Sequence, residues 1–126
     1  LPEGTKLLDL FIHDGGIPSP RTIRAFQKAV HQAWTKGAAV AVHCRAGLGR
    51  TGTLIGTMLI GDFGFGAKEA IAYLRIARPA SVLGNQPAFL MAHADGRIGD
   101  GGMTVKVEKP TTGKHGRKHY MRAVAK

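Results

Sequence analysis

Apolar and polar positions predict a strand and a helix in the first third of the chain. Residues 6–13 (KLLDLFIH) form an apolar run typical of a buried strand, and the turn-forming residues 14–18 end it. Ser19 then offers an N-cap with Pro20 as the first helical residue, and Gly37 offers a stop. The expected buried face of this helix consists of Ile23, Phe26, Val30, Ala33 and Trp34.

A second strand and three further helices are predicted next. Residues 38–43 form a short continuous apolar run, typical of a strand covered on both faces, and residues 44–49 form a loop. The expected helices run from Arg50 or Thr51 to about Phe63, over residues 67–77, and over residues 87–93. This order is typical of an α/β fold with a parallel sheet and flanking helices. Because such sheets usually contain more than two strands, we expect further N-terminal strands to precede this sequence.

Length and charge divide the chain into two parts. Its 126 residues allow one domain, and the net charge is +10. Residues 1–102 carry +4 of this charge and residues 103–126 carry +6. Residues 103–126 follow the glycine-rich stretch 99–102 and show no sustained periodicity. We therefore predict that they form a flexible basic tail. This tail is either a solvated terminus or a contact for an anionic partner such as nucleic acid or a membrane surface.

Several classes of protein are excluded by composition. No stretch reaches the roughly 18 apolar residues of a membrane helix. Cys44 is the single cysteine, so an intramolecular disulfide is impossible, and we expect a reducing compartment, the cytoplasm or the nucleus. The six histidines are scattered without a ligand spacing to Cys44, so neither a metal site nor a cofactor is expected. The composition leaves the oligomeric state open.

The stretch 43–52 (HCRAGLGRTG) contains the candidate reactive residues. It places the one thiol, Cys44, at a strand end and Arg50 at a helix start. Backbone N–H groups of such a loop form an anion-binding concavity, and the helix N-terminus adds partial positive charge. The same field favours a Cys44 thiolate, and the planar fork of Arg50 can bind two phosphate oxygens. The pattern indicates a phosphate site with a built-in nucleophile.

Two other phosphate-binding motifs are alternatives for this stretch. Residues 47–52 also fit the G-x-G-x-x-G pattern of dinucleotide-binding folds. That fold requires an acidic residue about 20 positions later at a strand end, whereas the candidate here, Glu69, lies in a helical pattern. A nucleoside-triphosphate loop is excluded because no Gly-Lys-Ser/Thr is present.

The stretch 43–52 resembles the H-C-x(5)-R-[ST] signature of cysteine-dependent protein tyrosine and dual-specificity phosphatases. Its residues 46–52 (AGLGRTG) are similar to those of the mitotic-exit dual-specificity subfamily. Residues 14–19 resemble the general-acid loop of that subfamily, and residues 78–86 its arginine-proline and glutamine segment. The resemblance covers roughly residues 5–95, the C-terminal part of such a catalytic domain. It implies that residues 1–102 adopt an α/β phosphatase fold.

The resemblance and the chemistry together suggest the roles of the residues. Cys44 would attack phosphorus and form a phosphocysteine, Arg50 would clamp the phosphate, and Asp14 would protonate the leaving oxygen. Thr51 would help the thiolate to leave, or simply cap its helix, and Gln86 would orient the hydrolytic water. The glutamine that follows in the subfamily is replaced here by Pro87.

The remaining candidate residues surround the phosphate. His43 would order the loop, unless it is merely a satisfied core histidine. Arg45 and Arg78 would touch substrate or hold a carboxylate, or else lie in solvent. The substrate phosphate is expected to contact the loop residues Arg45, Ala46, Gly47, Leu48, Gly49 and Arg50.

The expected substrates are proteins phosphorylated on Tyr and on Ser or Thr. Alternatives are a phosphoinositide or RNA 5′-phosphate, although lipid-directed relatives carry Lys in this loop where the chain has Ala46 and Leu48. A further alternative is a truncated, non-catalytic phosphate-binding module.

Overall fold

The elements follow the order that the apolar pattern predicts, with one strand added at the end. A computed structural model describes residues 3–96 and the backbone of residues 120–125. Its elements are β1 (Lys6–Phe11), α1 (Pro20–Thr35), β2 (Val40–His43), α2 (Gly49–Gly61), α3 (Ala67–Ala77), α4 (Gln86–Ala94) and β3 (Tyr120–Ala125). The predicted helices are confirmed with ends shifted by at most two residues. Both predicted strands are confirmed but are two residues shorter.

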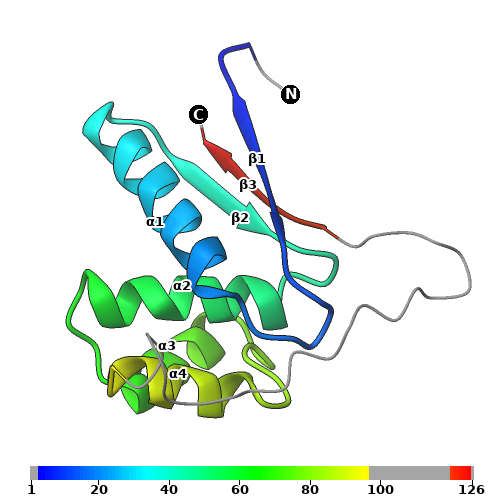
Figure 1. The fold of residues 1–126 in the computed structure, drawn as a ribbon, viewed down its shortest axis with the longest axis vertical. Helices are drawn as coiled ribbons and strands as arrows, with labels where there is room; N and C mark the ends of the chain where they lie inside the picture. Colours follow the sequence, from blue (N-terminus) through cyan, green and yellow to red (C-terminus); the bar gives the residue numbers. More distant parts are fainter. Residues whose placement is uncertain (1–2, 97–119, 126) are drawn as a thin grey trace, which may run out of the picture.

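The sheet has the strand order β1-β3-β2 (Figure 1). Strand β3 is antiparallel to both neighbours, and its Ala123 lies opposite Leu8 of β1 and Val42 of β2. Strands β1 and β2 therefore run in the same direction, as expected for a parallel α/β arrangement, but β3 lies between them and pairs with each in the antiparallel sense. Strand β3 thus supplies backbone partners to the facing edges of both strands.

The same strand corrects part of the tail prediction. Residues 120–125 belong to the sheet and are not a flexible extension. Local periodicity missed this strand because six residues with one basic side chain carry little signal of their own, whereas two flanking strands offer them a continuous backbone ladder. The rest of the predicted tail, residues 103–119, lies outside the described residues.

Helix α1 begins and ends at the predicted signals. The Ser19 hydroxyl accepts a hydrogen bond from Thr22 N at 3.1 Å, which satisfies one free N–H of the first turn. At the other end Gly37 has φ +66°, the left-handed conformation that favours glycine after a helix. The expected buried face is confirmed except for Trp34, which is 46% exposed. Trp34 instead makes an edge contact with Phe63, because it lies in the last turn.

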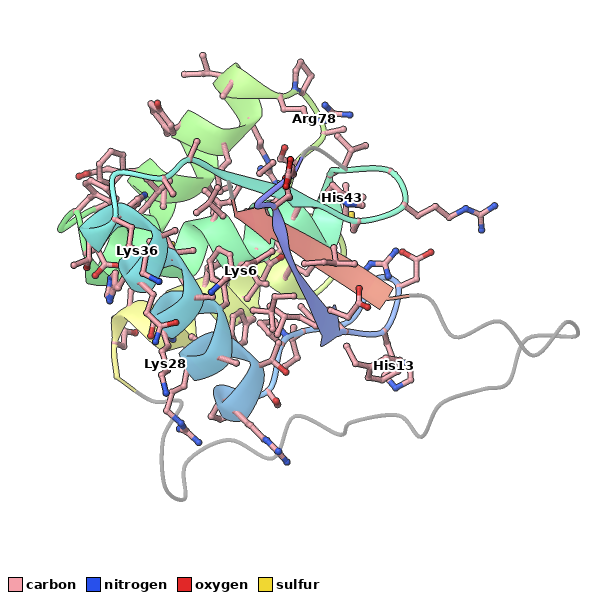
Figure 2. The ribbon with its side chains drawn as sticks, turned by 90° about the horizontal axis from the view of Figure 1, so that it is seen from above. Lys6, His13, Lys28, Lys36, His43 and Arg78 are labelled. Carbon is pink, nitrogen blue, oxygen red and sulfur yellow. The ribbon has the colours of Figure 1, made fainter. Side chains whose placement is uncertain are left out.

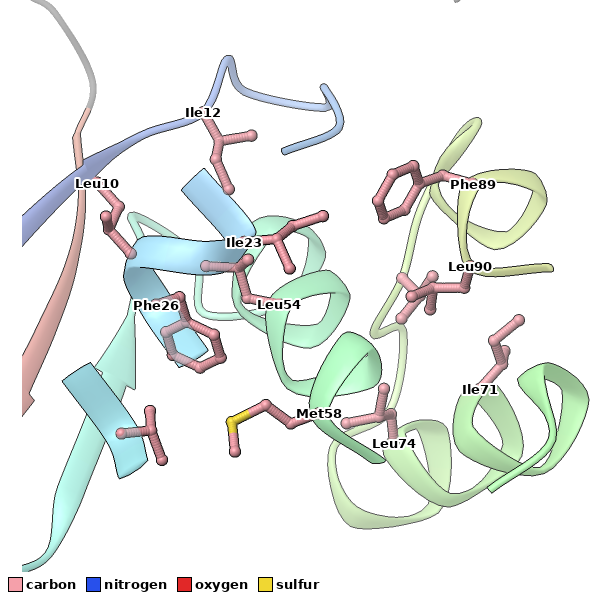
Figure 3. Packing of buried hydrophobic residues seen from close by; sticks show 12 residues of the cluster. Leu10, Ile12, Ile23, Phe26, Leu54, Met58, Ile71, Leu74, Phe89 and Leu90 are labelled. Atoms are coloured by element: carbon pink, nitrogen blue, oxygen red, sulfur yellow. The ribbon is translucent and has the colours of Figure 1, made fainter. Parts of the chain in front are cut away.

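The described helices cover the sheet from one side. Figure 3 shows the strands at one side, α2 in the middle and α3 and α4 at the other side. Along β2, partly buried Val40 and Val42 alternate with exposed Ala41 and His43, so the expectation of a strand covered on both faces is wrong within the described residues. Helix α1 packs against β1 and β3. In the described part of the chain, no helix has the length and apolarity needed to cross a bilayer.

A stripe of glycines on α2 brings the last described helix close to the site. A Cβ atom on Gly52 would lie 3.2 Å from a Val82 methyl group, and one on Gly56 would lie 2.8 Å from Leu90 Cδ1. The absence of side chains therefore lets α4 and the preceding loop approach the backbone of α2. The same packing buries Leu54, Leu74 and Leu90 in the core (Figure 3). It also sets Gln86 beside the first turn of α2.

Candidate active site

The loop after β2 places the one thiol against a backbone N–H group. Cys44 follows the last residue of β2 and is partly buried. Gly47 has φ +70°, and this turn directs the Gly47 N–H to Cys44 Sγ at 3.1 Å. Helix α2 then begins at Gly49, so the free N–H groups of its first turn lie beside the same loop. This arrangement suits a sulfur anion and a bound oxyanion.

The surroundings of Cys44 favour its ionised form. Partial burial acts to raise the pKa of the thiol, but the hydroxyl and N–H of Thr51, the N–H of Gly47 and the charge of Arg50 together outweigh it. The net effect is a pKa below the usual value of a thiol. The surroundings of Cys44 therefore support the predicted thiolate form of this residue.

Arg50 and Asp14 meet although they are far apart in the sequence. Arg50 is 2% exposed, and its Nη1 donates a hydrogen bond to Ile12 O at 3.4 Å. Its Nη2 lies 3.4 Å from Asp14 Oδ1, while the Asp14 side chain is 73% exposed on the turn that follows β1. The structure therefore brings together the expected phosphate clamp and the expected proton donor.

Thr51 lies in the first turn of α2, close to the thiol. Its hydroxyl oxygen is buried and makes no hydrogen bond of standard geometry to another described residue. Its influence on the sulfur is therefore that of a nearby dipole in this state. His43 and Arg45, which flank Cys44, are both exposed. The alternative that His43 is a satisfied core histidine is therefore wrong.

Arg78 is exposed and lies over the Cys44 loop. Its Nη2 donates a hydrogen bond to Ala46 O at 3.1 Å, and a Cβ atom on Gly47 would lie 3.3 Å from the same nitrogen. Figure 2 labels Arg78 together with His43, the residue at which β2 ends. The partner shown for Arg78 is thus a backbone carbonyl of the loop and not the carboxylate considered from the sequence.

The segment 78–84 holds the Cys44 loop from the far side. Val82 N donates a hydrogen bond to Leu48 O at 3.4 Å. Arg75 in turn donates hydrogen bonds to Ser81 O and Val82 O, at 3.1 and 3.0 Å. Sequence reasoning missed Arg75, because a side chain that binds backbone carbonyls of a later loop leaves no local pattern.

Gln86 is fully buried at the start of α4. Its Oε1 accepts a hydrogen bond from Leu83 N at 2.7 Å, and its Nε2 donates one to Gly16 O at 3.0 Å. The residue expected to orient water is therefore close to the Asp14 turn and the Cys44 loop, and its amide is bound to backbone at both atoms.

The assembled site offers a nucleophile, a cation and an acid at one place. Cys44 supplies the sulfur, N–H groups of the loop and of α2 surround it, and Arg50 and Asp14 close the other side. Among the residues that the structure describes, no group of three or more His, Cys, Asp or Glu side chains is placed to hold a metal ion. These groups suit displacement at a bound phosphoryl group by the thiolate.

Comparison with known proteins agrees with this geometry. Residues 18–95 match the family "dual specificity phosphatase, catalytic domain". The chain is 46% identical over 90 residues to tyrosine-protein phosphatase CDC14 of Candida albicans, covering 71% of this chain and 17% of the relative. It is 50% identical over 82 residues to dual specificity protein phosphatase CDC14AB of Danio rerio, covering 65% of this chain and 13% of the relative. The chain thus spans less than a fifth of the length of these relatives.

Proposed function

The chain belongs to the dual-specificity phosphatase catalytic-domain family, and on this basis we propose that it contributes the active site of a phosphoprotein phosphatase. The observation that carries the proposal is the Cys44 thiol of lowered pKa on a loop whose neighbouring helix presents Arg50 to Asp14. The similar proteins are named tyrosine-protein and dual specificity protein phosphatases, which supports phosphorylated Tyr and phosphorylated Ser or Thr as substrates.

The first chemical step transfers the phosphoryl group to sulfur. The Cys44 thiolate attacks phosphorus, the S–P bond forms, and the bond to the leaving oxygen breaks. Asp14 gives its proton to that oxygen, so the substrate leaves as a neutral alcohol or phenol. Arg50 and the loop N–H groups from Arg45 to Gly49 bind the phosphoryl oxygens and stabilise the charge of the transition state.

The second step returns the thiolate. A water molecule attacks phosphorus, the S–P bond breaks, and the Asp14 carboxylate accepts a proton from the water. Thr51 is proposed to turn its buried hydroxyl toward the departing sulfur, and His43 to support the loop from its exposed position beside Cys44. Inorganic phosphate is then released and Asp14 is again protonated for the next cycle.

Replacement of the nucleophile tests the proposal. Cys44→Ser should reduce hydrolysis of p-nitrophenyl phosphate and of phosphopeptides by several orders of magnitude, because a serine hydroxyl is not ionised at neutral pH. Turnover of the unaltered chain should persist in EDTA. Lys28→Ala, at an exposed position of α1, is the matched control and should retain activity. Full activity of Cys44→Ser would contradict the mechanism.

The same assays separate the alternative functions. Soluble phosphoinositides and RNA 5′-phosphates, measured beside phosphopeptides, show whether phosphoproteins are the preferred class. A chain that binds phosphate but hydrolyses none of these compounds would be a non-catalytic phosphate-binding module, and the proposed function would be wrong.

A further inference from the structure

Gln86 joins two segments that lie far apart in the sequence. Its Nε2 donates to Gly16 O, 70 residues earlier, while its Oε1 accepts from Leu83 N. These two partners define the orientation of the amide, because a carbonyl needs a donor and an N–H needs an acceptor. The side chain is 0% exposed, so both hydrogen bonds are protected from water.

The first turn of α2 provides the space for this amide. A Cβ atom on Gly49 would lie 2.9 Å from Gln86 Oε1 and 3.1 Å from Gln86 Nε2. A side chain at position 49 would therefore displace the Gln86 amide from its place across the start of α2. The amide touches the Asp14 turn on one side and the beginning of the catalytic helix on the other.

The hydrogen bond to Gly16 acts on the turn that carries Asp14. Gly16 N donates to His13 O at 2.8 Å, which closes a tight turn with Asp14 and Gly15 at its centre. The Asp14 side chain is 73% exposed, so water competes for its carboxylate and its ion pair with the buried Arg50 restrains the turn only weakly. The buried bond from Gln86 restrains the base of the turn instead.

We infer that Gln86 is a positioning residue that holds the Asp14 turn against the Cys44 loop. This inference rests on the proposed function. Its consequence is kinetic: Gln86 supports the first step, in which Asp14 must reach the leaving oxygen. A residue that only orients the hydrolytic water would act on the second step, and its amide would have to leave Gly16.

The two roles separate when the leaving group is varied. In Gln86→Glu, whose carboxylate cannot donate to Gly16 O, and in Gln86→Met, formation of phosphocysteine from phenyl phosphate should slow by ~10-fold or more. That is part of the roughly 10²–10⁴-fold that a positioned general acid supplies. The corresponding step with p-nitrophenyl phosphate should change little, because p-nitrophenolate leaves without protonation. Asn85→Ala, at the exposed neighbouring position, is the control and should behave like the unaltered chain.

A double-variant cycle makes the test specific to Asp14. In an Asp14→Asn background, Gln86→Met should have no further effect on the dependence on the leaving group, because the two residues act through one proton transfer. An equal slowing for both leaving groups, a slow second step with a normal first step, or additive effects with Asp14→Asn would each overturn the inference.

Further measurements distinguish a loss of stability in the Gln86 variants from an effect on the reaction. Rates are measured below the melting temperature of each variant, and hydrogen exchange of residues 13–17 should increase in Gln86→Glu. If both Gln86 variants fail to fold, Gly49→Ala, which displaces the amide without removing it, must show the same leaving-group pattern or the inference is overturned. Turnover by the unaltered chain that is lost in Cys44→Ser tests the proposed function independently.

Discussion

At the residue scale, the properties of Cys44 follow from its neighbours and not from the thiol itself. Burial alone would disfavour the thiolate. Gly47 and Thr51 reverse that preference with dipoles, and Arg50 adds a charge. In the proposed mechanism these groups also bind the phosphoryl group, so the arrangement that ionises the nucleophile would also stabilise the transition state.

Thr51→Val should therefore raise the pKa of Cys44. The variant keeps the shape of the side chain but removes the hydroxyl, so the midpoint for alkylation by iodoacetamide should move to higher pH by up to about 1 pH unit. Thr53→Val, two residues later in α2, is the control and should leave the midpoint unchanged, because the Thr53 hydroxyl binds Gly49 O. An unchanged midpoint in Thr51→Val would remove its proposed influence on the sulfur.

At the element scale, the loop between α3 and α4 combines strain with restraint. Ala80 and Val82 have φ values of +66° and +63°, in the left-handed region that costs non-glycine residues about 1 kcal/mol. Val82 is fully buried against α2, and Arg75 binds its carbonyl and that of Ser81. These contacts hold the loop where it can bind the Cys44 loop through Arg78 and Val82.

Ala80→Gly should stabilise the protein by roughly 0.5–1 kcal/mol, because glycine adopts the same conformation without the strain of a Cβ atom. Thermal unfolding measures the change. The contrasting variant is Ala72→Gly, at an exposed position in the middle of α3, which should destabilise by about 1 kcal/mol. A lower melting temperature for Ala80→Gly would show that its backbone is not strained.

Strand β3 makes a second prediction at this scale. Ala123 lies opposite residues of both β1 and β2, so Ala123→Pro removes an N–H donor from the middle of the sheet. We expect a loss of about 3 kcal/mol in the free energy of unfolding, measured by denaturant titration. Wild-type stability in Ala123→Pro, with Lys28→Pro in the interior of α1 as a destabilising positive control, would refute the central position of β3.

At the scale of the whole molecule, the site depends on how closely separate segments pack around α2. Gly49, Gly52 and Gly56 recur along one face of that helix and receive Gln86, Val82 and Leu90. The first turn of α2 thus contains the proposed catalytic residues Arg50 and Thr51, and the glycine face of the helix packs against the residues that contact the Cys44 loop and the Asp14 turn. We therefore expect stability and activity to be coupled through this helix.

Gly52→Leu should affect both properties. The added side chain would meet Val82 and Ser81, and overpacking of this kind costs typically ~1–3 kcal/mol. Displacement of the segment 78–84 from the Cys44 loop should also lower kcat. Gly61→Ala, whose Cβ would lie 3.8 Å from the flexible end of Gln27, is the control: it should leave kcat unchanged and should not lower the melting temperature. Normal thermal unfolding and normal kcat in Gly52→Leu would contradict this coupling.

The sequence by itself determined whatever depends on neighbouring residues. Helix α1 follows from Ser19, its apolar face and Gly37. The Cys44 loop and the start of α2 follow from the ten consecutive residues 43–52, because short-range sterics and hydrogen bonds act within one segment. The family resemblance added Asp14 and Gln86 as candidates.

Only the tertiary structure decided which distant groups meet. Arg50 reaches Asp14, Gln86 reaches Gly16, Arg78 reaches Ala46, and β3 enters between β1 and β2. These contacts depend on how closely helices and strands pack and on which backbone groups lack partners, and neither property is encoded in the residues that surround any one of them in the chain.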